Sequence, residues 1–180
     1  FDSDGLSAPA LWEINNTNDN GYIASGGFGA NNAIKVSSDG SFVWSVDLSG
    51  GSFPKYIEQF ENGKYVALDG EIAYVISESG EIENSYDIGY SYSFDGKIID
   101  NETFVGVWTD FSETHFKETN TIGEVIWEVI FENPFRSVDR LESGEFFLSG
   151  FCCYPDSSVF IKTDPEGTPL WEKKYDLSGF

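Results

Sequence analysis

The stretch of sequence that decides the fold is VFIKTDPEGTPLWEKKYDLSG, at residues 159–179. The same pattern occurs earlier, in AIKVSSDGSFVWSVDLSGG at residues 33–51. In each segment an apolar run leads into a polar turn that contains a glycine, and a tryptophan follows four residues after that glycine. Such a repetition indicates that the chain is built from copies of one structural unit.

The unit occurs four times along the chain. Two further turns, SESGE and NTIGE, contain the matching glycines, so that successive turn glycines are 40, 43 and 44 residues apart. The turn glycines are Gly40, Gly80, Gly123 and Gly167, and the residues four positions later are Trp44, Asn84, Trp127 and Trp171. Because the whole chain has only five tryptophans, finding one at three of the four equivalent positions argues against chance.

Each unit consists of short runs rich in aromatic and branched residues, such as GYIASGG and NAIKVS, with Gly, Asn, Asp and Ser between them. These runs alternate with a period of two, and no long stretch has a helical period. A unit of about 40–45 residues made of strands alone is typical of a β-propeller blade. We expect the tryptophan after each turn to open the outermost strand and to cover the seam to the next blade.

The sequence therefore predicts an all-β, four-bladed β-propeller with four antiparallel strands in each blade. After an N-terminal tail at residues 1–9, a single propeller domain would span residues 10–180. The predicted blades lie at about 10–51, 52–90, 91–134 and 135–177.

The pattern of an apolar strand, IKTDxxG and a tryptophan resembles the tandem propeller repeats of secreted and cell-surface bacterial and archaeal proteins. The similarity is greatest in the fourth unit, whereas the second unit has Asn84 in place of tryptophan and the third has FKETNTIG. A weaker similarity, through DGxxxW at residues 39–44 and DxxGxxxW at 164–171, is to the Trp-docking repeats of quinoproteins. Quinoproteins need roughly twice as many blades to surround a quinone, so we expect no cofactor from this second resemblance.

The chain is strongly acidic, with 31 acidic and 10 basic residues and a formal net charge of −21. Nucleic acid and anionic membrane surfaces are not expected as partners, because phosphate binding needs clustered Lys and Arg. The even spread of Asp and Glu is typical of a self-repelling extracellular or salt-adapted surface, and a cation-binding surface is the alternative. No apolar run approaches the roughly 20 residues that span a bilayer, so we expect no membrane insertion.

The chain contains no methionine. We therefore expect a processed protein, such as a secreted one without its signal peptide, or an internal piece of a longer protein. Either way, the repeat resemblance favours an extracellular or cell-surface location.

Catalytic residues are sparse. His115 is the only histidine, so it has no second histidine with which to form a multi-His metal site, and no GxSxG motif accompanies it. Carboxylates are too numerous for the sequence to single out a glycosidase pair. We expect the protein not to be an enzyme, and His115 to be an ordinary strand residue.

Two features suggest a cation. The DSDG segment at residues 2–5 begins like a calcium loop, but the ligands expected later in such a loop are missing, so we expect an ordinary acidic N-terminal tail there. Aligning the innermost strands places Glu13, Glu58, Lys97 and Asp139 at one blade position. If these side chains point to the axis, the three carboxylates would form a site for a hard cation such as calcium. If they fan out into solvent, Lys97 neutralises a neighbour instead.

Two candidate modifications involve short motifs. Cys152 and Cys153 are adjacent and are the only cysteines, so they form a vicinal disulfide, bond to other chains, or remain free thiols. The triplets NNT and NET make Asn15 and Asn101 candidates for N-glycosylation.

The predicted function is that of a non-catalytic structural or adhesion module, which we expect to assemble with copies of itself into a filament or sheath. Exposed sheet edges favour this hypothesis because they invite pairing with another chain. The alternatives are a glycan- or protein-binding propeller and a quinoprotein-like enzyme fragment. For glycan binding, the candidate rim aromatics are Tyr90, Tyr92, Trp108 and Tyr154.

Overall fold

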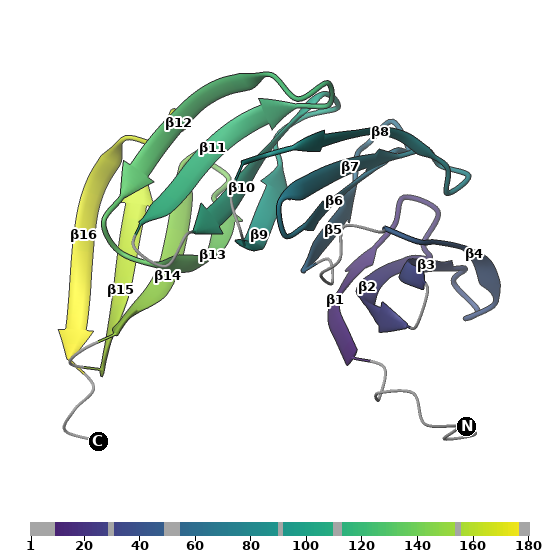
Figure 1. Cartoon of the computed structure of the whole chain (residues 1–180), viewed down its shortest axis with the longest axis horizontal. Helices are drawn as coiled ribbons and strands as arrows, with labels where there is room; N and C mark the ends of the chain where they lie inside the picture. The colour runs from purple at the N-terminus through teal and green to yellow at the C-terminus, as the bar shows by residue number, and fades with distance from the viewer. Residues whose placement is uncertain are drawn as a thin grey trace. The chain divides into compact units, whose positions relative to one another are not determined.

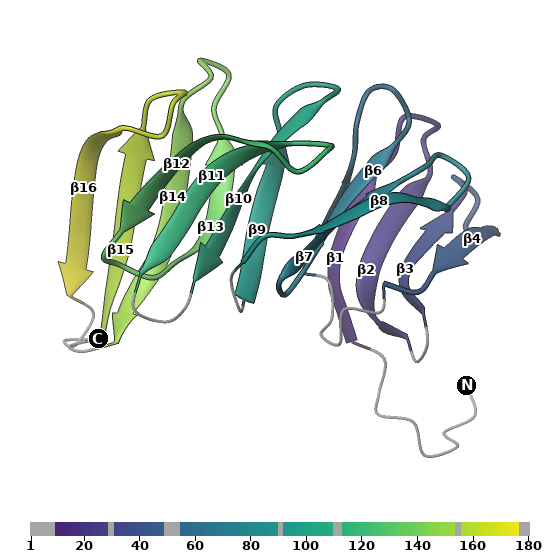
Figure 2. The ribbon, with the colours of Figure 1, turned by 45° about the horizontal axis from the view of Figure 1, so that its top comes forward.

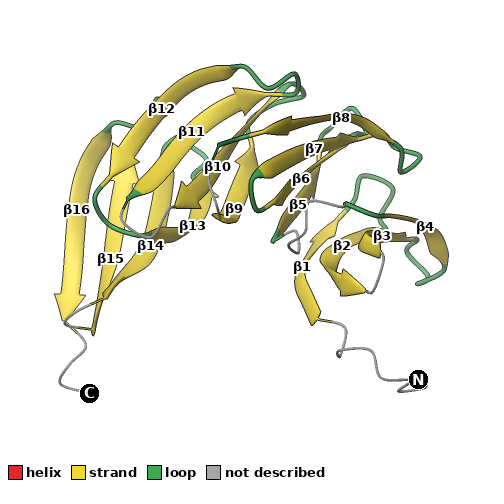
Figure 3. Cartoon of the chain, in the orientation of Figure 1, coloured by secondary structure: helices red, strands yellow, loops and turns green. Residues whose placement is uncertain are grey.

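The structure is a computed structural model that describes residues 10–28, 31–48, 55–89, 92–109, 113–153 and 156–176. Within these ranges the chain forms strands and turns and contains no helix (Figure 3). The strands make four antiparallel sheets of four strands each, and neighbouring strands in every sheet are consecutive in the sequence. The predicted all-β fold with four four-stranded blades is confirmed, and each sheet falls within one of the four predicted intervals.

The strands are numbered along the chain and grouped by blade (Figure 1). Blade 1 contains β1 (Ala10–Asn16), β2 (Tyr22–Phe28), β3 (Asn31–Val36) and β4 (Phe42–Val46). Blade 2 contains β5 (Tyr56–Gln59), β6 (Tyr65–Asp69), β7 (Ile72–Ile76) and β8 (Ile82–Asp87). Blade 3 contains β9 (Tyr92–Ile98), β10 (Thr103–Thr109), β11 (Thr114–Asn120) and β12 (Val125–Phe131). Blade 4 contains β13 (Phe135–Arg140), β14 (Phe146–Cys153), β15 (Asp156–Thr163) and β16 (Pro169–Asp176).

The glycine turn between the third and fourth strands has the same geometry in all four blades. The glycine adopts a φ between 80° and 92°, and its N–H donates to the carbonyl three residues earlier. The strand register then shifts by one residue immediately beside the turn, at Lys35/Val36 in blade 1 and at the equivalent pairs in the other blades. This is the hairpin in which a turn is closed by a residue in the left-handed region, where glycine is favoured.

The blades pack in two compact units, Phe1–Ile88 and Gly89–Phe180, each with its own core. In the first unit, blades 1 and 2 enclose a cluster that includes Ile23, Trp44 and Tyr65. In the second unit, blades 3 and 4 enclose a cluster that includes Phe116 and Phe146. Both views of the ribbon show the two sheets of each unit lying beside one another (Figures 1 and 2).

The tryptophans at Gly+4 cover the seams between blades inside both units. Trp44 of blade 1 lies against Gly80 of blade 2, donates its Nε1–H to the Glu78 carbonyl at 3.0 Å and meets the Tyr65 ring edge-on at 5.3 Å. Trp127 of blade 3 lies in the same way against Gly167 of blade 4. Gly80 and Gly167 therefore each serve also as the flat surface on which the preceding blade's tryptophan rests, and a side chain at either position would collide with the ring.

This arrangement gives a test with an internal control. We expect Gly80→Ala and Gly167→Ala to lower the free energy of unfolding by about 2–4 kcal/mol, because the new methyl carbon would meet an indole ring at 2.7 Å in addition to the strained φ. Gly40 has a φ of 83° and no atom within 4 Å of the added carbon, so Gly40→Ala should cost only about 1–2 kcal/mol. Urea denaturation of dilute protein measures all three, and equal losses would contradict the role of the tryptophans.

Candidate functional site

Carboxylates on the innermost strands join neighbouring blades. Glu13 on β1 accepts a hydrogen bond from the backbone N–H of Ile57 on β5 at 2.7 Å, and Asn15 donates to the Ile57 carbonyl at 2.7 Å. In the second unit Asp95 on β9 accepts from the backbone N–H of Val138 on β13 at 2.9 Å. By strand register, Glu13 and Asp95 occupy the same position on the first strand of their blades. Ile57 and Val138, whose N–H groups they accept from, are likewise at equivalent positions. The same device therefore couples blade 1 to blade 2 and blade 3 to blade 4.

Burying a carboxylate between blades disfavours its charged form, and the pKa of Asp95 shows this effect. Burial raises the pKa of its carboxyl above the ordinary value, while hydrogen bonds from Ser137 and Val138 and the charge of Lys97 act in the opposite direction. Sequence reasoning missed Asp95, because one acid among 31 acidic residues has no local signal that it reaches a backbone 43 residues away.

The strand register corrects one part of the predicted axial ring. Glu58, Lys97 and Asp139 do share a blade position, since they lie opposite Val66, Val105 and Phe147. In blade 1 this position belongs to Asn15, opposite Ile23, and Glu13 lies two residues earlier. The alignment of Glu13 was wrong by two residues, because the register places Glu13 opposite Ser25 and Asn15 opposite Ile23.

The axial side chains have protein partners inside each unit. The Tyr56 hydroxyl donates to Glu58 Oε2 at 2.5 Å, and Lys97 Nζ lies 3.9 Å from Asp139 Oδ1. Among the described residues, no three His, Cys, Asp or Glu side chains lie together in a way that could hold a metal ion. The axial cation site stays a prediction.

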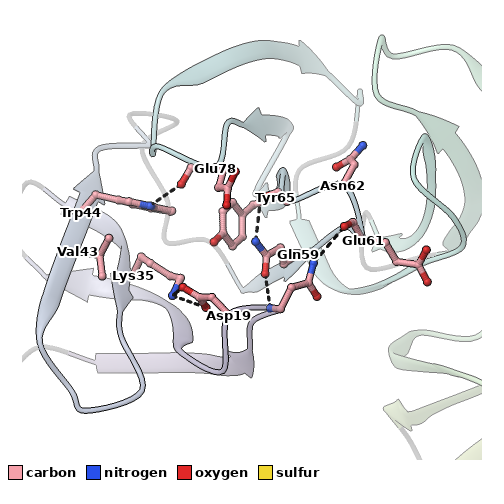
Figure 4. Close-up of a pocket in the computed structure, with 11 residues that line it drawn as sticks. Asp19, Lys35, Val43, Trp44, Gln59, Glu61, Asn62, Tyr65 and Glu78 are labelled. Atoms are coloured by element: carbon pink, nitrogen blue, oxygen red, sulfur yellow. Dashed lines mark hydrogen bonds and ion pairs between the residues drawn. The ribbon is translucent and has the colours of Figure 1, made fainter.

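A polar pocket lies where the turns of blades 1 and 2 meet (Figure 4). Its cavity of about 300 Å³ is lined by Lys35 and Trp44 of blade 1, by Gln59 and Tyr65 of blade 2 and by the turns of both blades. The Lys35 ammonium is buried and lies 2.9 Å from Asp19 Oδ2. It also donates to the Val36 carbonyl at 3.0 Å. The buried cation is thereby neutralised by a carboxylate from the adjacent turn.

The electrostatics of the pocket are dominated by these charges. The Thr17 hydroxyl, followed by the Lys35 ammonium and the Gly21 N–H, holds the pKa of Asp19 well below its ordinary range. Burial, together with the negative charges of Asp19 and Glu78, raises the pKa of Tyr65 to about 12. Asp19 is therefore an anion and Tyr65 a neutral phenol at neutral pH.

Most polar groups of the pocket already bond to the protein. The Asn18 N–H donates to Gln59 Oε1 at 2.7 Å, and the Asn18 amide donates to the Phe60 carbonyl at 2.9 Å. Gln59 Nε2 donates to the Gly63 carbonyl at 2.9 Å. These bonds fasten the two turns together, so we interpret the pocket as a structural junction.

His115 lies on β11, where it is buried. Its Nδ1 is 3.0 Å from Glu128 Oε1 and its Nε2 is 3.3 Å from Glu113 Oε1. Both ring nitrogens therefore lie beside carboxylate oxygens. The geometry is that of a strand residue satisfied by its neighbours.

A group of aromatic side chains lies on blade 4. A shallow groove there is lined by Phe147, Ser158, Phe160, Trp171, Lys173 and Tyr175. Phe160 meets Phe147 in a stacked arrangement at 5.7 Å and Tyr175 edge-on at 5.7 Å, and Phe147 meets Trp171 at 5.9 Å. Trp171 and Tyr175 are 38% and 50% exposed, whereas Trp44 at the equivalent position of blade 1 is 9% exposed. We call this set of side chains the outer face of blade 4.

The remaining predicted positions are distributed over the fold. The Asn15 amide that would carry a glycan donates hydrogen bonds to Glu13 and Ile57, whereas Asn101 is exposed in the turn between β9 and β10. Trp108 was wrongly predicted to be an exposed rim aromatic: it is fully buried on β10, against the Lys117 ammonium.

Several candidates fall on residues outside the description. The DSDG segment at 2–5, Tyr90 and Tyr154 lie outside the described residues. For Tyr92, Cys152 and Cys153 the structure describes only the backbone, with both cysteines in β14 opposite Ser157 and Asp156. The vicinal disulfide stays a prediction.

Comparison with known proteins shows the fold alone. No protein-family model and no curated protein matches the chain. Among solved structures, the chain is similar to the WD40 domain of Neurospora crassa Pan2, with a TM-score of 0.72 and 11% identity, covering 94% of this chain and 50% of that one. It is similar to a streptogramin B lyase, with a TM-score of 0.71 and 13% identity over 94% of this chain and 55% of that one.

A third similar structure is BamB from Moraxella catarrhalis, with a TM-score of 0.58 and 11% identity over 88% of this chain and 62% of that one. The chain thus spans between half and two thirds of the length of these three structures. The likeness establishes blades of the β-propeller type. None of the described residues form a helix long and apolar enough to cross a membrane.

The Asp19–Lys35 pair predicts a pH-dependent stability. Replacing Asp19 by Asn leaves a buried ammonium without its counter-charge and should cost about 1–3 kcal/mol at neutral pH. Because folding depresses the pKa of Asp19 below its ordinary 3.8, this contribution is complete above that value and is lost as the pH falls below it. Thermal unfolding between about pH 2 and pH 7 should show the two proteins converging at low pH.

Asp39→Asn is the matched control. Asp39 occupies a similar turn, where the Ser37 hydroxyl and the Ser41 N–H lower its pKa to about 2, and no lysine is among the described groups that shift this pKa. Its replacement should have a smaller effect, and an equal effect would mean that Lys35 contributes nothing.

Proposed function

We propose that the chain is a non-catalytic β-propeller module of a secreted or cell-surface protein, which binds protein partners and assembles with copies of itself into an extracellular filament or sheath. The observation that carries the proposal is the outer face of blade 4, where two stacked phenylalanines are flanked by an exposed tryptophan and an exposed tyrosine. Aromatic side chains gathered on a surface supply much of the binding energy in protein interfaces.

The charge distribution supports the same proposal. With a net charge of −21, copies of the chain repel one another over the whole surface, so a specific attractive patch is needed for assembly. The outer strand of blade 4 carries Lys173 and Lys174, two of the ten basic residues, both exposed. Glu172 and Asp176 also lie on β16, and the Lys174 ammonium is 3.3 Å from Glu172 Oε1, so the exposed aromatic side chains lie on a strand whose charges sum to zero.

A glycan-binding module is the second candidate, because Trp171 and Tyr175 offer exposed rings on which a sugar can stack beside the polar Ser158 and Lys173. An array of glycans probed with the wild-type chain and with Trp171→Ala separates the two functions. Binding that disappears in the variant would favour this candidate over the protein-binding module.

Self-assembly predicts that molecular size grows with concentration. Sedimentation velocity on the wild-type chain should show larger species as the concentration rises. Added salt should favour the larger species, because it screens the repulsion between acidic copies. At 0.15 M ionic strength, charges more than about 8 Å apart barely repel one another. Monomers at every concentration and salt level would exclude self-assembly.

The proposed location predicts a modified native protein. Mass spectrometry of protein from its natural source should show a mass above 20.0 kDa in hexose-sized steps. The added mass should disappear with Asn101→Gln and persist with Asn15→Gln, because the Asn15 amide already bonds to Glu13 and Ile57. A bare 20.0 kDa chain would remove this support for an extracellular location.

A further inference from the structure

The outer edge of blade 4 is formed by β16, the end strand of its sheet (Figures 1 and 2). One edge of β16 pairs with β15 in a regular register from Trp171 to Asp176, and no described strand pairs with its other edge. The N–H and C=O groups along such an edge can pair with a further strand. This edge belongs to the sheet of blade 4 alone, so it does not depend on what lies against either face of the blade.

The sequence of β16 is self-complementary about Lys173. On one side of Lys173 stand Trp171 and Glu172, and on the other side stand Lys174 and Tyr175. When two copies of β16 are paired antiparallel with Lys173 opposite Lys173, each Glu172 lies opposite Lys174 of the other copy and each Trp171 lies opposite Tyr175. Opposite charges and aromatic pairs at such directly opposed positions stabilise a sheet. The like-charged pair of Lys173 at the centre is the one unfavourable contact.

Contacts within the strand place these charges where the pairing needs them. Lys174 Nζ lies 3.3 Å from Glu172 Oε1, so both charges lie on the same side of the strand. In the paired arrangement these two groups and their counterparts form a square in which the signs alternate. On the other side of the strand, Lys173 Nζ lies 5.5 Å from the centroid of the Trp171 ring. An aromatic ring attracts a cation, which lessens the cost of the central pair of lysines.

The outer strands of the other three blades do not complement β16. β4 has no charged residue, β8 has two acidic residues and β12 has one, and none of the three has a lysine or an arginine. None of them can therefore place a cation opposite Glu172. β16 occurs once in the chain, so the strand that complements it in both charge and aromatic content is β16 of a second copy.

We propose that β16 pairs antiparallel with β16 of a second copy, with Lys173 at the two-fold axis, so that the two four-stranded sheets of blade 4 join edge to edge. This proposal rests on the self-assembly proposed above and names one of its contacts. An edge that pairs with itself closes at a dimer, so a filament requires a further contact elsewhere on the chain. Because the charges of β16 sum to zero, this edge approaches its counterpart without the repulsion that acts between the acidic surfaces.

The experiment exchanges the two paired charges in the full chain. Glu172→Lys alone places lysine opposite lysine, and Lys174→Glu alone places glutamate opposite glutamate. Sedimentation equilibrium should show dimerisation weakened by about tenfold or more in each single variant. An equimolar mixture of the two variants should dimerise like the wild type, because every lysine at these positions then faces a glutamate. Native mass spectrometry with one variant isotopically labelled identifies the mixed dimer, and the double variant should dimerise by itself.

Glu142→Lys is the matched control, because Glu142 is exposed in the turn after β13 and its replacement changes the net charge as much as Glu172→Lys does. A smaller net charge favours association, so this control should dimerise at least as strongly as the wild type, whereas Glu172→Lys should dimerise more weakly. Lys173→Thr removes the central like-charged pair and should tighten the dimer. All residues of β16 are exposed, so circular dichroism and thermal unfolding of the variants should match the wild type.

The outcomes separate this contact from self-assembly in general. Single variants that dimerise like the wild type would overturn the pairing of β16 and leave self-assembly standing. A mixture that stays monomeric, although the wild type associates, would do the same. The expected charge-exchange result with wild-type dimers that never grow further would support the pairing and exclude the filament. A wild-type chain that is monomeric at every concentration would overturn both.

Discussion

The contact between a tryptophan and the glycine turn of the following blade is the interaction on which both units depend. The glycine in this contact meets two requirements, the conformation of its own turn and the packing of the neighbouring blade. The turn needs a residue with positive φ, and the absence of a β-carbon at that residue leaves a flat surface for an indole. A substitution at the glycine therefore disturbs two things at once, the hairpin of its own blade and the packing of the neighbouring blade.

Hydrogen bonds between the innermost strands of neighbouring blades complete each junction. The Glu13 and Asp95 carboxylates accept hydrogen bonds from backbone N–H groups on the first strand of the next blade. In the first unit the Asn15 amide also donates to the carbonyl of Ile57. The backbone groups at the junction thereby find partners although no strand pairs with them there, as buried polar groups must. Apolar packing across the facing sheets and hydrogen bonds at the innermost strands together hold neighbouring blades against each other.

Burial of sheet faces at blade junctions also bears on function. A blade is a sheet with two faces, and a stable propeller junction buries one face of each neighbour. An aromatic face that stays exposed is consequently available for binding. In this chain the exposed aromatic face of blade 4 includes side chains of β16, a strand on which two lysines are balanced by Glu172 and Asp176.

The sequence by itself determined the sixteen strands, the four blades, the positive-φ glycines and the tryptophans at their fixed offset, because these features follow from alternation and turn geometry within a few residues. Only the tertiary structure decided that Asp95 couples blades, that Asp19 neutralises Lys35, that Trp108 is buried and that Ile14 and Tyr22 are exposed. The reason is physical. Burial of a strand residue depends on which blade lies against it some 40 residues away, and the residue's own alternation pattern is the same whether that blade is present or absent.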